Sequence, residues 1–86
     1  MLHVGCGGDP LPRYFGDDPQ ETRLDRDAAH APDIVGSMVD LGEIGPFDAV
    51  YSSHSLEHLY PHDGARALRE FLRVLVPGGK ALVIVP

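Results

Sequence analysis

Two glycines and an aspartate near the start of the chain have the types and the spacing of a nucleotide-binding site. Gly5 and Gly7 follow a short apolar stretch, and a glycine after a strand lets a ligand approach the backbone because no side chain stands there. Asp25 lies about twenty residues further along, at the offset where a carboxylate commonly accepts the hydroxyls of a ribose. We therefore expect a ribose-binding site. The alternative is that the glycines only form a tight turn and that Asp25 is a solvent-exposed acid without a ligand.

The residues after these glycines distinguish between cofactors. A dinucleotide motif that starts at Gly5 needs a third glycine where the chain has Pro10, followed by a long helix that binds a pyrophosphate. The prolines between Gly8 and Glu21 leave room only for a turn or a short helix around Leu11–Phe15. This pattern favours a ligand with a ribose but no pyrophosphate, such as S-adenosylmethionine, over a nicotinamide dinucleotide.

Five segments of the chain occur in the order found in one large enzyme family. They are Val4–Gly7, Leu24–Asp27, Asp33–Met38 with Asp40-Leu41, Phe47–Leu59 and Leu68–Gly79. Through these segments the chain resembles the class I S-adenosylmethionine-dependent methyltransferases of the type-11 kind. It departs from the family pattern in its short, proline-rich first crossover and at Ser37, where the family often has an acid near the adenine amine.

The resemblance implies an α/β fold, with a Rossmann-like open parallel sheet of about five short strands in the order 3-2-1-4-5. One clear helix is expected, and the family's last two strands would follow the segments that match. Residues 1–86 would then form a single, incomplete S-adenosylmethionine-binding methyltransferase domain. A non-catalytic remnant that keeps the sheet without turnover is the alternative.

Short apolar runs between turn residues predict where the strands lie. The expected strands are Leu2–Gly5, Thr22–Leu24, Asp33–Val35, Phe47–Ser52 and Lys80–Val85. The near-continuous apolar run Ala81–Val85 is typical of a parallel strand that is covered on both faces. The crossover through Ala28–Pro32 is too short for a regular helix.

One amphipathic helix is predicted after the fourth strand. Its apolar residues recur at helical spacing and should form the face that packs on the sheet. They are Ala65, Leu68, Leu72 and Leu75, with Phe71 adjoining. Asp63 is the expected N-cap, and Pro77-Gly78-Gly79 is expected to end the helix.

The resemblance also implies which residues contact the cofactor, S-adenosylmethionine. They are Gly5, Cys6, Gly7, Asp25, Ser37, Met38, Ser53 and His54. A small side chain at Cys6 would pack under the cofactor, whereas Ser53 and His54 belong to the loop that covers its methionine end. The implied reaction is direct displacement of the methyl group from the sulfonium, in which the protein aligns donor and acceptor and excludes water. No catalytic base is assigned, and the expected acceptor is a small molecule that the sequence does not identify.

A metal site is the competing interpretation of residues 54–58. They read His54-Ser55-Leu56-Glu57-His58, the H-x-x-E-H pattern of inverted zinc proteases, which would make the chain a metal hydrolase fragment. Two histidines four apart on a helix can share one metal. However, the segment directly follows an expected strand, and Pro61 stops a helix within about a turn. A third ligand is not evident nearby, and we expect no metal.

The composition argues against several classes of partner. The net charge is −6 and the pI is near 5.1, so we do not expect the basic surface that binds nucleic acid or an anionic membrane. No apolar run approaches the length of a membrane-spanning helix. A single cysteine cannot form an internal disulfide, which fits a cytoplasmic location. The oligomeric state is left open.

Overall fold

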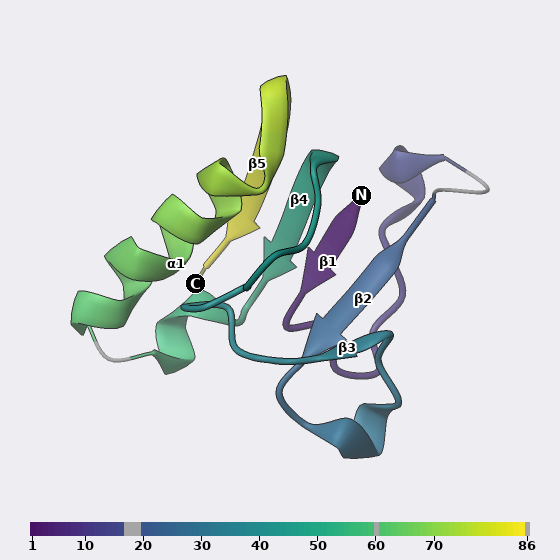
Figure 1. Cartoon of the computed structure of the whole chain (residues 1–86). Coiled ribbons are helices and arrows are strands. Elements are labelled where there is room, and N and C mark those ends of the chain that lie inside the picture. The colour runs from purple at the N-terminus through teal and green to yellow at the C-terminus, as the bar shows by residue number, and fades with distance from the viewer. Residues whose placement is uncertain (17–19, 60, 86) are drawn as a thin grey trace.

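A parallel sheet forms the centre of the computed structural model, which describes residues 1–16, 20–59 and 61–85. The strands are β1 (Leu2–Val4), β2 (Thr22–Asp25), β3 (Ile34–Val35), β4 (Phe47–Ser53) and β5 (Leu75–Ile84). They lie side by side in the order β3-β2-β1-β4-β5, and each neighbouring pair is parallel (Figure 1). The predicted order 3-2-1-4-5 and the Rossmann-like α/β fold are therefore confirmed.

The described parts of the crossovers on either side of β2 each contain one 3-10 turn. The first holds η1 (Arg13–Phe15), and the second holds η2 (Ala28–His30). Prolines restrict the first crossover, and the second is too short for a longer helix, as expected. Asp27 caps η2, since its carboxylate accepts a hydrogen bond from the Ala29 N–H at 2.9 Å. Among the residues that the structure describes in these two crossovers, none belongs to a long helix whose N-terminus could face a ligand.

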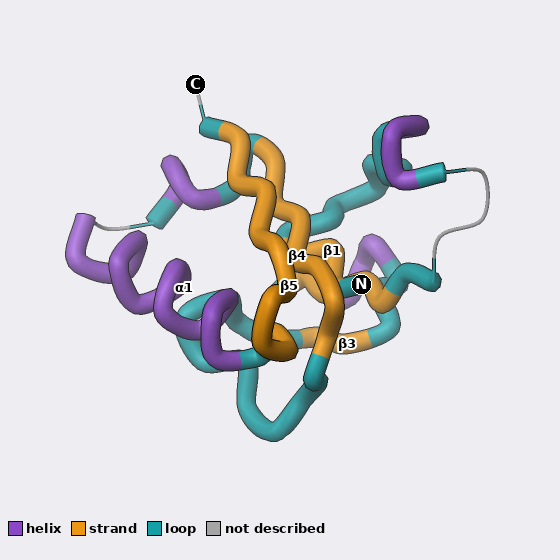
Figure 2. The backbone as a smooth tube through the Cα atoms, turned by 90° about the horizontal axis from the view of Figure 1, so that it is seen from above, coloured by secondary structure: helices purple, strands orange, loops and turns teal. Residues whose placement is uncertain are grey.

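The α-helix α1 (Pro61–Arg73) covers one face of the sheet beside β4 and β5 (Figures 1 and 2). A core of buried residues joins the two layers. It includes Leu2, Val4, Leu24 and Val50 from the strands, with Ala67, Phe71 and Val74 from the helix and the residue after it. None of the helices in the described part of the chain has the length and apolar character needed to cross a membrane.

The predicted core face of the helix is wrong. Leu68 and Leu72 are 42% and 68% exposed, whereas Ala67 and Phe71 are fully buried. The two apolar stripes lie about a third of a turn apart around the helix, and both have helical spacing. The sheet selects the stripe that contains the large ring of Phe71, so periodicity alone could not distinguish them.

Both predicted ends of the helix also differ from the structure. Pro61 is the first helical residue, a position where its missing N–H has no consequence, and Asp63 lies inside the first turn rather than at the N-cap. The helix ends at Arg73, and β5 already begins at Leu75. Compared with the prediction, the helix begins and ends several residues closer to the N-terminus.

The segment Pro77-Gly78-Gly79 forms an irregularity within β5 instead of a helix cap. Leu75 pairs with Phe47 and Lys80 with Ala49, so more residues of β5 than of β4 lie between these two pairings. Gly78 has φ +82°, and a proline that cannot donate to a ladder is tolerated at a bulge. The expected coverage of both faces of this strand is also wrong, because Leu82 is 40% exposed.

Glu70 connects α1 to the loop that precedes β4. Its carboxylate accepts hydrogen bonds from Arg73 Nε at 2.7 Å and from the backbone N–H of the buried Leu41 at 2.8 Å. The Arg73 side chain also donates to the Gly42 carbonyl at 2.7 Å. The hydrogen bond from Arg73, followed by that from Leu41, lowers the pKa of Glu70 to about 2.

We expect Glu70→Gln to lower the free energy of unfolding at neutral pH, because it weakens the hydrogen bonds that the carboxylate accepts. The loss should be limited to about 1 kcal/mol, since the partner Arg73 is half exposed. The folded pKa lies below the ordinary value of 4.5, so this stabilisation is present above 4.5 and is lost as the pH falls toward 2. Urea unfolding between pH 7 and pH 2 measures the difference. The exposed Glu43→Gln variant is the control, and a Glu70→Gln effect that stays constant down to pH 2 contradicts this account.

Candidate functional site

A cavity of about 350 Å³ opens at the carboxyl ends of the first strands of the sheet. This is the size of a site for a small ligand. It lies beside β1 and the end of β4, where the strand order reverses and open parallel sheets bind their ligands. The cavity contains six of the residues that the sequence predicted for the cofactor, namely Gly5, Gly7, Asp25, Ser37, Met38 and His54.

The chain turns away from β1 through glycines in left-handed conformations. Gly5 has φ +64° and Gly7 has φ +51°, a region that side chains disfavour. A Cβ at Gly5 would meet the Ser55 hydroxyl and lie 2.8 Å from the Ser55 Cβ. The Ser55 hydroxyl in turn donates toward the carbonyl oxygens of Gly5 and Ser53, each 3.2 Å away. Close packing of the loop after β4 on the loop after β1 therefore requires glycine at position 5.

Asp25 connects the end of β2 to the glycine loop, the segment from Gly5 to Asp9 that follows β1. One carboxylate oxygen accepts a hydrogen bond from the Gly7 N–H at 2.8 Å, and the other accepts from the Asp27 N–H at 2.8 Å. Partial burial raises the pKa of Asp25, but these N–H groups of Asp27 and Gly7 outweigh it and leave the pKa below its ordinary value. The group is therefore an anion at neutral pH. Each of its oxygens has a second lone pair for a ligand hydroxyl.

His54 adopts an unusual backbone conformation at the edge of the cavity. Its φ is +54°, which is uncommon for residues other than glycine and is often found at functional sites. The His54 N–H donates to the Ile84 carbonyl of β5 at 2.7 Å. The side chain is 62% exposed, and its Nδ1 lies 3.7 Å from the carboxylate of Glu57. An accessible imidazole is thus held beside a carboxylate at the cavity.

The structure does not form the helix that the H-x-x-E-H interpretation requires. His54 precedes the 3-10 turn η3 (Leu56–His58), so the two histidines are not carried by one α-helix. The side chain of His58 lies outside the described residues. Among the side chains that are described, no group of three or more His, Cys, Asp or Glu could hold a metal ion.

Two of the predicted contact residues lie next to the cavity rather than in its wall. Cys6 is buried, and burial raises the pKa of its thiol, so it is protonated at neutral pH. Ser53 is half buried at the end of β4. Neither side chain lines the cavity, and their contact with a cofactor stays a prediction.

Several wall residues were not predicted. They are Leu24, Arg26, His30, Gly36, Ser55 and Leu59. Four of these adjoin a predicted residue in sequence, which is the signal that could have identified them. His30 and Leu59 have no such signal, because their place in the wall depends on where η2 and the segment after η3 fold back.

Comparisons with known proteins agree with this geometry. The model of a family described as "Methyltransferase domain" matches residues 2–83. Among solved structures, the sugar N-methyltransferase KedS8 from Streptoalloteichus sp ATCC 53650 is similar, with a TM-score of 0.77 and 25% sequence identity. The alignment covers 95% of this chain and 38% of that one, so the chain spans less than half the length of that enzyme. No curated protein matches.

Proposed function

This chain belongs to the methyltransferase domain family, and from that premise we propose that it binds S-adenosylmethionine for methyl transfer to a small molecule. One observation carries the proposal. The ionised Asp25 lies in the wall of the same cavity as Gly5 and Gly7, and its carboxylate holds the Gly7 N–H. A ribose acceptor and an open stretch of glycine backbone are therefore adjacent, which is the arrangement that a nucleoside requires.

The residues present fit this cofactor. Nothing lies within 4 Å of a Cβ built at Gly7, so the backbone there is open to a ligand. Asp25 would take the ribose hydroxyls, and Ser37 with Met38 would lie along the adenine. His54 and Ser55, which also line the cavity, would lie along the methionine part.

The bound cofactor would supply a methyl group already activated by the positive charge on sulfur. The task left to the chain is to hold the donor in one orientation and to exclude water. The Asp25 anion and the glycine loop would fix the nucleoside. The exposed imidazole of His54 lies beside Glu57 at the cavity and would contact an acceptor there.

The choice of a small-molecule acceptor is supported by the likeness to a sugar N-methyltransferase. Two further statements about the whole protein remain predictions. They are the assignment of residues 1–86 to one cofactor-binding domain and the cytoplasmic location inferred from the single cysteine.

We expect the protein to bind S-adenosylhomocysteine saturably and to show no binding of NAD at the same concentrations. The reason is that the glycine loop is followed by η1, a single 3-10 turn, which cannot hold a pyrophosphate as a long helix does. Isothermal titration calorimetry with both ligands is the measurement. The Glu43→Gln variant, altered on an exposed loop, should bind as the wild type does. Binding of NAD without any response to S-adenosylhomocysteine would overturn the proposal.

A further inference from the structure

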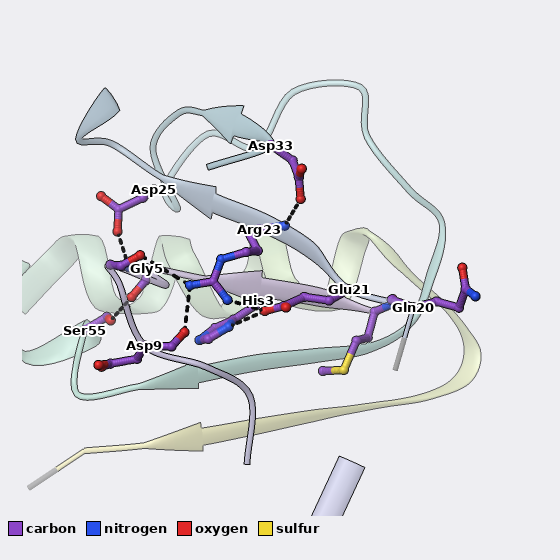
Figure 3. Close-up of polar contacts among 11 residues, drawn as sticks. His3, Gly5, Asp9, Gln20, Glu21, Arg23, Asp25, Asp33 and Ser55 are labelled. Atoms are coloured by element: carbon purple, nitrogen blue, oxygen red, sulfur yellow. Dashed lines mark hydrogen bonds and ion pairs between the residues drawn. The ribbon is translucent and has the colours of Figure 1, made fainter. Parts of the chain in front are cut away.

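Charged side chains on one face of β2 bind both an N–H group and carbonyl groups of the glycine loop. Arg23 and Asp25 are two residues apart on a strand, so they share a face. Asp25 accepts from the N–H of Gly7, while Arg23 Nη2 donates to the Gly7 carbonyl at 3.3 Å and to the Asp9 carbonyl at 2.7 Å. The peptide groups on both sides of Gly7 are therefore held by neighbouring side chains of one strand. Figure 3 shows Arg23 and Asp25 beside Gly5 and Asp9 of this loop.

The Arg23 guanidinium is itself fixed from β1. Its Nη1 donates to Glu21 Oε2 at 2.8 Å, and the same oxygen lies 2.7 Å from His3 Nδ1. His3 pairs with Arg23 across the sheet, and its side chain is only 3% exposed. The His3 ring also packs against Tyr51 of β4, with 5.1 Å between ring centroids. The row of side chains thus runs from the interior of the sheet to the loop (Figure 3).

This geometry differs from an ordinary surface ion pair. The side chains of Arg23 and Glu21 are only 24% and 20% exposed, and the guanidinium contacts two backbone carbonyls besides the carboxylate. A guanidinium has five donors in a planar fork and can serve such divergent partners together, whereas an ammonium is a point charge. A lysine at position 23 could keep the ion pair with Glu21 but would not reproduce the fork.

We propose that Arg23 is a positioning residue for the cofactor site, an inference that rests on the proposed function. Arg23 does not line the cavity. Held by Glu21 and His3, it fixes the Gly7 peptide so that its N–H meets Asp25 and the loop is shaped before the ligand arrives. Glycine-rich backbone is otherwise free to adopt many conformations, and ordering it on binding would weaken affinity.

The first test compares Arg23→Gln and Arg23→Lys with Arg69→Gln, which alters an exposed arginine of α1. We expect Arg23→Gln to weaken binding of S-adenosylhomocysteine about tenfold and Arg23→Lys to rescue it only in part. Arg69→Gln should leave the affinity unchanged. Calorimetry gives the affinities, and urea unfolding without ligand gives the stabilities. Wild-type affinity in a folded Arg23→Gln or Arg23→Lys protein overturns the proposal.

The second test measures the loop without ligand. In Arg23→Lys, hydrogen exchange of the Gly7 amide should become faster relative to that of the His54 amide, which is bonded to Ile84 across β4 and β5. A purely structural defect would accelerate both amides together and would overturn the proposal. If the wild type binds no S-adenosylhomocysteine, the proposed function fails, whereas unchanged Gly7 exchange with intact wild-type binding removes only the role of Arg23.

Discussion

Replacing Gly5 by alanine is expected to lower the free energy of unfolding by about 2–4 kcal/mol and to abolish cofactor binding. Two costs combine at this position. The backbone has φ +64°, where a side chain is disfavoured, and the new Cβ would lie 2.8 Å from the Ser55 Cβ. Relief of the clash would displace the loop after β4 from the cavity wall. Urea unfolding and calorimetry with S-adenosylhomocysteine measure the two effects.

The neighbouring glycines provide matched controls for this prediction. A Cβ at Gly7 or Gly8 has nothing within 4 Å, but only Gly7 has a positive φ. Gly8→Ala should therefore be nearly neutral in stability, and Gly7→Ala should show the conformational cost alone, about 1–2 kcal/mol. Combining Gly5→Ala with Ser55→Gly should recover the steric part of the loss. Equal stabilities of the Gly5→Ala and Gly8→Ala proteins would contradict the packing described at Ser55.

Replacing Asp25 by alanine is expected to weaken binding of S-adenosylhomocysteine by about 1.5–3 kcal/mol, the usual cost of losing hydrogen bonds to a charged group. Calorimetry at neutral pH gives this value. The pKa of Asp25 is lowered by the N–H groups of Asp27 and Gly7, despite partial burial that acts in the opposite direction. Because the ionised form binds, affinity should be flat around neutral pH and fall only when the pH drops below the ordinary value of 3.8.

The ribose contact can be separated from the loop contact by changing the ligand as well. Asp25 also holds the Gly7 N–H, so the alanine variant loosens the loop. Removing the ribose 2′-hydroxyl of S-adenosylhomocysteine should weaken binding to the wild type but not to Asp25→Ala, which is the coupling expected of a direct contact. Asp27→Ala is the control, since its carboxylate is half exposed and caps η2. Coupling at Asp27 in place of Asp25 would move the ribose contact to that residue.

The sequence by itself predicted the features that single residues or short segments encode. The strand order was implied by the resemblance of five ordered segments to the methyltransferase family. The short first crossover follows from prolines that restrict φ and lack an N–H. Gly5 is required by a local backbone conformation. Asp25 was predicted from its offset to that glycine, and the structure brings both to one cavity.

Only the tertiary structure decided which surfaces and side chains meet. The helix carries two apolar stripes of equal periodicity, and contact with the sheet buried Phe71 while it left Leu72 exposed. The turn-forming residues Pro77-Gly78-Gly79 became part of β5, because pairing with β4 continued on both sides of them. Local signals could not reveal either result, since each depends on a partner far away in sequence.

The row from His3 through Glu21 to Arg23 shows the same limit at the candidate site. In the sequence these are a lone histidine and two charges that could each be solvated. Parallel pairing of β1 with β2 places His3 beside Arg23, and the glycine loop then folds back over the guanidinium. Side-chain hydrogen bonds act over about 3 Å, so their partners exist only once the strands have been brought together.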